Sequence, residues 1–100
     1  MKKHGNSNEN DTDHHLYEIF DLERSNTYKY GICGDPLNKD GSSPRGKTQA
    51  KEFNRAFGWF RFLVRILLTG IPGRREAKRI EAEYIEAYRE KWGEYPPGNQ

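Results

Sequence analysis

The chain has 100 residues, which allows one small domain. Only 33% of the residues are hydrophobic and the mean hydropathy is −1.11, so the core must be thin and partly aromatic. The single cysteine, Cys33, excludes an intramolecular disulfide and means that a structural zinc site would need other ligands. It fits a protein that works in a reducing compartment.

The net charge of +2 conceals a basic block in the middle of the chain. Residues 45–79 contain ten Lys or Arg and two acidic residues, which gives +8, whereas the segments before and after the block each sum to −3. Such a concentration of positive charge favours a partner that carries phosphate groups. A solvated surface with basic residues spaced for solubility explains the charge equally well.

The first predicted segment is a disordered lead-in over residues 1–14, because these residues show no apolar periodicity. No apolar run follows Lys2 and Lys3, so we expect no signal peptide in this chain. The apolar run WFRFLVRILLTGI contains Arg61 and Arg65 and is too short to span a membrane, so we expect no membrane insertion. The predicted domain covers residues 15–100.

The domain is predicted to begin with a hairpin. Residues 16–23 and 26–33 are short and rich in aromatic and branched side chains, which is typical of strands, and a polar break separates them. Residues 34–44 contain glycines, prolines, Asn38 and Asp40, which predicts a loop.

A helix is predicted over residues 44–57, because Ser43 can cap it and Gly58 can end it. Apolar residues alternate over residues 59–68, which favours a third strand over an amphipathic helix. A proline then opens a last helix over residues 72–92, and an extended tail follows. The order β-β-α-β-α predicts an α+β fold with a three-stranded, mainly antiparallel sheet flanked by helices.

One carboxylate lies on the apolar face of the last predicted helix. An ionised carboxylate that faces a core is costly unless it is paired with a cation or bound to a metal. Glu81 is therefore a candidate metal ligand, although it could also lie at the edge of the apolar stripe or pair with an arginine of the basic block. The residues at helical spacing that share this stripe are Ala77, Ile80, Glu81, Tyr84, Ile85 and Tyr88.

Four further residues are candidates for chemistry. Tyr17 in the first strand and Lys29 in the second could be cross-strand neighbours, and a nearby ammonium would lower the pKa of the tyrosine. Arg45 lies in the first turn of the first helix, where an anion can bind, and Gln49 lies one turn further on the same side. The alternatives are a packing tyrosine, a solvated lysine and a surface arginine.

These residues resemble the motifs of the GIY-YIG nuclease superfamily, whose fold is URI-type. The Gly-Ile-Tyr element corresponds to HLY, with Tyr17 kept and His15 in place of glycine. The Tyr-Ile-Gly element corresponds to KYG, with Gly31 kept and Lys29 in place of tyrosine. The glutamate of that superfamily's last helix corresponds to Glu81 within AKRIEAEYI.

Two more positions extend the resemblance. The helix arginine of the superfamily matches Arg45, and the residue one turn later, often histidine or tyrosine there, is Gln49 here. A terminal asparagine of the superfamily corresponds to Asn99. The chain is most similar to the small members that occur as C-terminal toxin domains of secreted bacterial polymorphic proteins.

The resemblance implies a metal-dependent endonuclease that hydrolyses nucleic acid, with DNA favoured over RNA and the choice left open by the sequence. Glu81 would hold Mg²⁺ or Mn²⁺, Tyr17 would act as general base or orient the attacking water, and Lys29 would assist Tyr17 or activate water itself. Arg45 would bind the scissile phosphate, Gln49 could hydrogen-bond the phosphate or water, and Asn99 would support the site. The basic block offers candidates for tracking the nucleic-acid backbone, of which some must be ordinary surface residues because not all can face one groove. They are Lys47, Lys51, Arg55, Arg61, Arg65, Arg74, Arg75, Lys78 and Arg79.

The resemblance also implies partners and a place of action. A toxin domain of this kind would be used in interbacterial competition, delivered as part of a larger effector, act in the cytoplasm of the target cell and have a cognate immunity protein. The competing interpretation is a non-catalytic, basic nucleic-acid-binding module on the same fold. A third is a small domain that pairs with an acidic protein.

Overall fold

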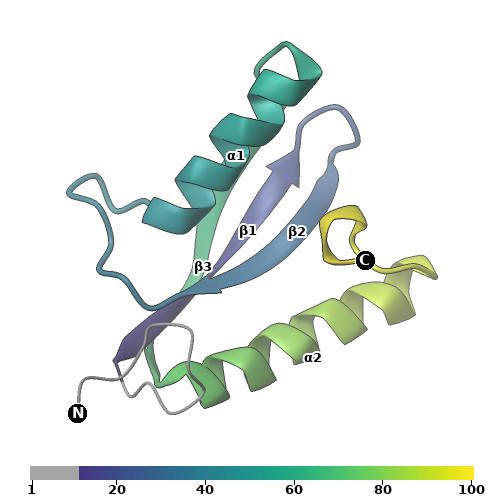
Figure 1. Ribbon diagram of the computed structural model, residues 1–100. Helices are drawn as coiled ribbons and strands as arrows, with labels where there is room; N and C mark the ends of the chain where they lie inside the picture. Colours follow the sequence, from purple (N-terminus) through teal and green to yellow (C-terminus); the bar gives the residue numbers. More distant parts are fainter. Residues whose placement is uncertain (1–11) are drawn as a thin grey trace.

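The computed structural model describes residues 12–100 of the protein (Figure 1). The chain forms a three-stranded sheet with the spatial order β2-β1-β3, in which both pairs of strands are antiparallel. This confirms the predicted α+β class and the order β-β-α-β-α. The elements are β1 (Asp13–Asp21), β2 (Asn26–Cys33), α1 (Pro44–Phe57), β3 (Phe62–Pro72), α2 (Arg74–Trp92) and a short 3-10 helix, η1 (Pro97–Asn99).

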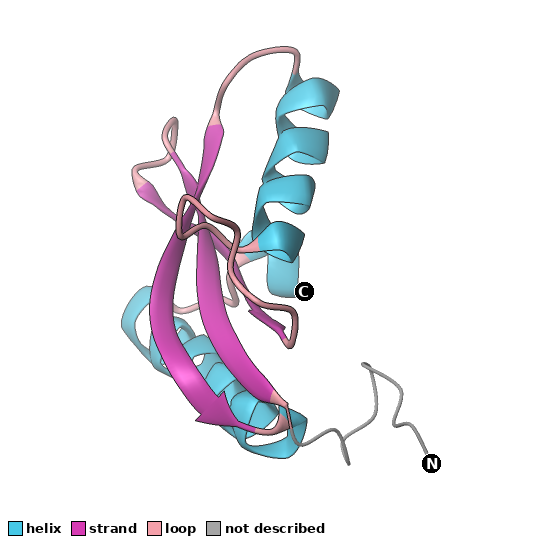
Figure 2. Cartoon of the chain, turned by 90° about the vertical axis from the view of Figure 1, so that its left-hand side faces the viewer, coloured by secondary structure: helices cyan, strands magenta, loops and turns pink. Residues whose placement is uncertain are grey.

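The two helices cover opposite faces of the sheet (Figures 1 and 2). On the face toward α1, Tyr17, Ile19 and Phe62 are almost fully buried and pack with Ala50 of the helix. The cluster on the other face brings Ala77 of α2 together with sheet residues, namely Leu16, Ile32 and Ile71. The central strand β1 supplies side chains to both layers, because alternate residues of a strand point to opposite faces.

The first strand begins earlier than the sequence predicts. β1 starts at Asp13, where it pairs with Pro72 of β3, and His14 is 2% exposed. The predicted boundary of the lead-in after His14 is therefore wrong for these two residues, because β3 is long enough to pair with them. Residues 1–11, the rest of the predicted lead-in, lie outside the described residues.

The first helix begins and ends as predicted. The Ser43 hydroxyl accepts a hydrogen bond from the Gly46 amide at 3.1 Å, which is the bond expected of an N-cap. Gly58 has φ 78°, a left-handed conformation that glycine adopts without steric cost. His15 donates to or accepts from the same Ser43 hydroxyl at 2.7 Å, so β1 and the start of α1 are joined by a buried contact.

The later boundaries differ from the prediction. β3 runs over Phe62–Pro72 in place of residues 59–68, and Phe60 before it is 66% exposed. Pro72 ends this strand and does not open α2, which starts at Arg74 after Gly73, whose φ is 87°. The predicted extended tail contains η1, which packs on β2. Within residues 12–100, no helix has the length and apolarity needed to cross a membrane.

Candidate active site

Tyr17 is held in a slot between two glycines. In the register of β1 and β2, Tyr17 is opposite Gly31, and a Cβ at Gly31 would lie 2.3 Å from Tyr17 Cζ. A Cβ at Gly46 of α1 would lie 2.9 Å from Tyr17 Cδ1. The ring therefore occupies the space that a side chain at position 31 would fill, and it reaches across β2 toward the free edge of the sheet. Its hydroxyl donates to Gln49 Oε1 at 2.8 Å.

The proton of Tyr17 is held more tightly than the sequence predicts. Burial raises the pKa of the Tyr17 hydroxyl well above its ordinary value, and the guanidinium of Arg45 only partly opposes this effect. The expectation that Lys29 lowers the pKa of Tyr17 is therefore wrong, because burial has the larger effect and raises this pKa. Lys29 is opposite Ile19 in the register, one diagonal position from Tyr17, so the two residues share a face without being direct partners.

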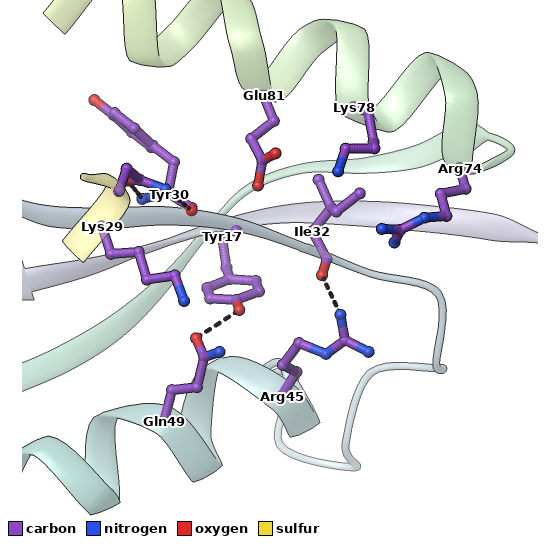
Figure 3. Close-up of a pocket in the computed structure, with 11 residues that line it drawn as sticks. Tyr17, Lys29, Tyr30, Ile32, Arg45, Gln49, Arg74, Lys78 and Glu81 are labelled. Carbon is purple, nitrogen blue, oxygen red and sulfur yellow. Dashed lines mark hydrogen bonds between the residues drawn. The ribbon is translucent and has the colours of Figure 1, made fainter. Parts of the chain in front are cut away.

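Arg45 and Gln49 approach Tyr17 from α1, as their spacing of four residues predicts. Arg45 donates one hydrogen bond from its guanidinium to the carbonyl of Ile32 at 3.2 Å. Ile32 lies in β2, an edge strand, so the guanidinium is fixed at the border of the sheet. Figure 3 shows Arg45, Gln49, Lys29 and the Tyr17 ring on one side of the β2 ribbon.

Glu81 comes to the same border from α2, on the other side of the sheet (Figure 3). Its side chain is half-buried and makes no hydrogen bond or ion pair within residues 12–100. The two buried carboxylates of the described residues are paired: Asp21 with Arg61, and Glu18 with Arg65. Burial raises the pKa of Glu81, and the positive charges of Lys78, Lys29 and Arg74 act in the opposite direction. The alternative that Glu81 pairs with an arginine of the basic block is not observed.

These side chains surround one hollow at the outer edge of β2, which we call the edge pocket. Its volume is about 150 Å³. Four of the lining residues carry positive charge, and Glu81 is the one acidic side chain among them. The lining residues are Tyr17, Lys29, Tyr30, Gly31, Ile32, Arg45, Gln49, Arg74, Lys78, Glu81 and Asn99.

The sequence predicts Arg74 and Lys78 only as two of the many backbone-tracking candidates of the basic block, and not as residues of this site. They precede Glu81 by seven and three positions, so all three lie on the same side of α2. That spacing was available in the sequence, but the basic block offers many lysines and arginines, and only the packing of α2 against β2 selects these two.

Asn99 has a defined structural task at the edge pocket. Its Oδ1 accepts a hydrogen bond from the Tyr30 amide at 2.8 Å, and its Nδ2 donates to the Tyr30 carbonyl at 2.9 Å. The side chain therefore pairs with the outer edge of β2 as a neighbouring strand would. Because both ends of the amide pair with Tyr30, Asn99 positions the strand and the tail.

Of the predicted backbone-tracking residues, Arg74 and Lys78 line the edge pocket and the others lie outside it. Lys47 and Lys51 line a separate apolar groove between α1 and β3, and Arg55 is exposed on α1. Arg61 holds the buried Asp21 carboxylate through two hydrogen bonds of 2.8 Å, so its charge serves the fold. Arg65 pairs with Glu18 at 3.2 Å and lies over the Phe20 ring.

A metal ion at this site would rest on few protein ligands. Residues 12–100 contain no group of three or more His, Cys, Asp or Glu side chains that could hold an ion. Glu81, however, is an unpaired carboxylate beside a cavity with room for water molecules. Carboxylate and water oxygens are the ligands that Mg²⁺ accepts, often with a single protein carboxylate, so the donor set fits a hydrated divalent ion.

Comparison with protein families finds a match over most of the chain. A family model described as URI fold toxin 2 matches residues 7–93. The matched range contains every lining residue of the edge pocket except Asn99. No curated protein and no solved structure matches the chain.

Proposed function

The chain belongs to the URI fold toxin 2 family, and we propose that this toxin domain is a metal-dependent endonuclease that hydrolyses phosphodiester bonds of nucleic acid, DNA in preference to RNA. The main support for the proposal is the position of Glu81. This unpaired, half-buried carboxylate extends from α2 into a pocket whose other charged side chains are positive. A fold gains no stability from burying such a group alone, so a bound cation explains its presence. The preference for DNA follows from the resemblance to GIY-YIG nucleases.

Glu81 would hold the ion, Mg²⁺ or Mn²⁺, which when bound would polarise the phosphate and stabilise the leaving oxygen. The chain's own cations would neutralise the substrate. Arg45, anchored on the Ile32 carbonyl, keeps further N–H groups for a phosphate oxygen. Lys29 lines the same pocket and supplies a second positive charge close to Tyr17.

Tyr17 would orient water and not remove its proton. With its pKa raised by burial, the hydroxyl keeps its proton at neutral pH and donates a hydrogen bond to Gln49 Oε1. Its oxygen can still accept a hydrogen bond from an attacking water molecule. Of the two roles predicted for Tyr17, orientation of water agrees with this electrostatic setting, and Gln49 would fix the direction of the hydroxyl.

The test is cleavage of plasmid DNA and, separately, of total RNA, each with Mg²⁺, with Mn²⁺ and with EDTA. The variants are Glu81→Ala and Arg45→Ala, with Glu90→Ala and Arg75→Ala as controls, because the latter two residues are exposed and outside the edge pocket. We expect metal-dependent cleavage that both site variants lose and both controls keep. Absence of cleavage in every condition, or equal cleavage by site variants and controls, would refute the proposal.

The non-catalytic binding module is a second candidate. One observation favours it: the two groups beside the expected nucleophile, Tyr17 with its raised pKa and the neutral Gln49, are poor proton acceptors. This candidate predicts salt-sensitive binding of nucleic acid without cleavage, unaffected by Glu81→Gln. Metal-dependent turnover in the assay above would reject it.

Membership of a toxin family supports two further parts of the proposal. We propose that the domain is delivered as part of a larger effector and acts in the cytoplasm of the target cell. A cognate immunity protein would then protect the producing cell, and an acidic surface on it would complement the cations of the edge pocket. Co-expression of such a protein should abolish both toxicity and cleavage.

A further inference from the structure

The border of the sheet opposite the edge pocket has an apolar groove, which we call the β3 groove. It lies between α1 and the edge strand β3, and its volume is about 490 Å³. Phe60, one of its lining residues, is 66% exposed. An apolar surface that is open to solvent and rimmed by polar residues is typical of an interaction site. The lining residues are Ser42, Lys47, Ala50, Lys51, Asn54, Phe60, Phe62, Leu63 and Val64.

The main chain of β3 has unpaired groups on the side of this groove. The Phe62 amide and carbonyl bond to the Asn54 side chain of α1 at 2.7 and 2.9 Å, so they point away from β1. The register with β1 is regular from Phe62 to Ile66, and main-chain groups of successive residues turn to alternate sides of a strand. Those of Val64 and Ile66 therefore also point outward, where they make no hydrogen bond within residues 12–100.

An unpaired strand edge beside an apolar groove is the arrangement that accepts an extended peptide segment. The added strand gains main-chain hydrogen bonds from the edge, and its alternate side chains enter the groove. The outer edge of β2 differs, because Arg45 and Asn99 already bond to its main-chain groups. Since β2 and β3 are the two borders of the sheet (Figure 1), β3 is the border at which the sheet can be extended.

The charges around the β3 groove indicate an acidic occupant. Lys47 and Lys51 are its charged lining residues, and its lining contains no acidic side chain. Lys47 pairs with the exposed Asp40 at 3.4 Å, whereas Lys51 has no ion pair among the described residues. A second copy of this chain would bring its own two lysines to the same place, and like charges disfavour association. Nucleic acid would match the lysines but would bury the apolar lining against phosphate groups.

From these features we propose that the β3 groove binds an extended, acidic segment of a partner protein, which joins the sheet as a further strand next to β3. Apolar side chains of that segment lie against Phe62 and Val64, and its glutamates or aspartates meet Lys51. Because the edge pocket is at the opposite border of the sheet, a partner bound here leaves that pocket open. This interaction surface is separate from the one proposed above for an immunity protein at the edge pocket.

The first experiment measures binding of a fluorescein-labelled peptide by fluorescence anisotropy. The probe has a valine–threonine–valine–threonine–valine centre and two glutamates at each end. We expect saturable binding that Lys51→Glu and Phe60→Ser each weaken roughly tenfold, through lost charge attraction and lost apolar contact. Lys91→Glu is the matched control, because Lys91 is exposed on α2, on the other face of the sheet, and should leave binding unchanged. No saturable binding below about 1 mM, or equal binding by all variants, would overturn the proposal.

The second experiment tests whether the bound segment pairs with the strand. Hydrogen exchange at the Val64 and Ile66 amides is followed by ¹H–¹⁵N NMR with and without the probe. We expect the probe to slow exchange at both amides roughly tenfold, because new hydrogen bonds protect them. A probe N-methylated at its central residues cannot form these bonds and should not slow exchange. Binding of the first probe with unchanged exchange at both amides would overturn the pairing with β3.

Two results would assign the groove to another occupant and overturn the proposal. One is concentration-dependent dimerisation without peptide that slows exchange at Val64, which would mean a second copy of the chain. The other is displacement of the probe by a DNA duplex that Phe60→Ser protein binds as tightly as wild type, which would mean a nucleic-acid surface. The readouts are binding and exchange, so the presence or absence of nuclease activity does not alter their interpretation.

Discussion

Gly31→Ala is expected to displace Tyr17 and destabilise the fold. The added Cβ would lie 2.3 Å from Tyr17 Cζ and 2.4 Å from its hydroxyl oxygen, whereas carbon atoms in contact are about 3.5 Å apart. The ring would have to retreat by about 1 Å, and the backbone of α1 at Gly46 blocks it on the other side. Overpacking of this kind costs about 2 kcal/mol, or roughly 10 °C in Tm for a domain of this size. Loss of the bond from Tyr17 to Gln49 should also reduce cleavage.

A double-mutant cycle identifies the cause, with stability measured by urea unfolding. Tyr17→Leu removes Cζ, Cε1 and the hydroxyl, the three atoms that the new Cβ would meet. In that background Gly31→Ala should cost less than about 0.5 kcal/mol, because the clash is gone. Tyr17→Phe keeps the ring, so the clash and its cost should persist there. An equal cost of Gly31→Ala in all three backgrounds would refute the steric reasoning and point to the backbone of β2.

Three other predictions follow from the same structure. Because burial raises the pKa of Glu81, its ionised form opposes folding above the ordinary carboxyl pKa, so Glu81→Gln should leave the stability unchanged or raise it near neutral pH without metal. The same variant should abolish the rise in Tm that we expect when Mn²⁺ is added, whereas Glu90→Gln, at an exposed position, should keep that rise. The hydrogen bonds from Arg61 lower the pKa of Asp21, so this carboxylate stabilises the fold above about pH 4. That stabilisation is lost as the pH falls through the lowered pKa of Asp21 in the folded protein. Asp21→Asn should cost about 3 kcal/mol in urea unfolding near neutral pH, and a wild-type curve without a loss in acid would contradict this. Asn99→Ala should cost about 1–2 kcal/mol and speed hydrogen exchange at the Tyr30 amide, and unchanged exchange would show that the tail does not cover this edge.

Local signals in the sequence predict most of the fold. Ser43 and Gly58 bound α1 because a side-chain cap and a left-handed glycine act within a few residues. The start of β1 is a different case. Asp13 and His14 have no strand pattern of their own, and they become extended because β3 runs on to Pro72 and pairs with them. The start of β1 and the end of β3 are therefore set by a contact between distant segments, which no local pattern reports.

The structure brings the residues that the sequence nominates to one pocket, but the electrostatic setting of Tyr17 differs from the expectation. Glu81 stands out in the sequence because a carboxylate on an apolar stripe needs an explanation. The pKa of Tyr17 could not be predicted, because its direction depends on whether burial or nearby positive charge has the larger effect. A lysine on the neighbouring strand suggests a lowered value, but the ring lies under α1, where loss of solvent dominates.

The position of β2 at the edge of the sheet explains how Glu81 and Tyr17 can share a site at all. Tyr17 belongs to the layer under α1 and Glu81 to the helix on the opposite face, so a wider sheet would separate them. They meet because only β2 lies between Tyr17 and the border, and Gly31 lets the ring pass over that strand. Arg45 and Asn99 then occupy main-chain groups of the same edge, at Ile32 and Tyr30. A further strand that paired with β2 would extend the sheet and fill the pocket. Because Arg45 and Asn99 occupy main-chain groups of β2, they hinder such pairing and so keep the pocket open to a substrate.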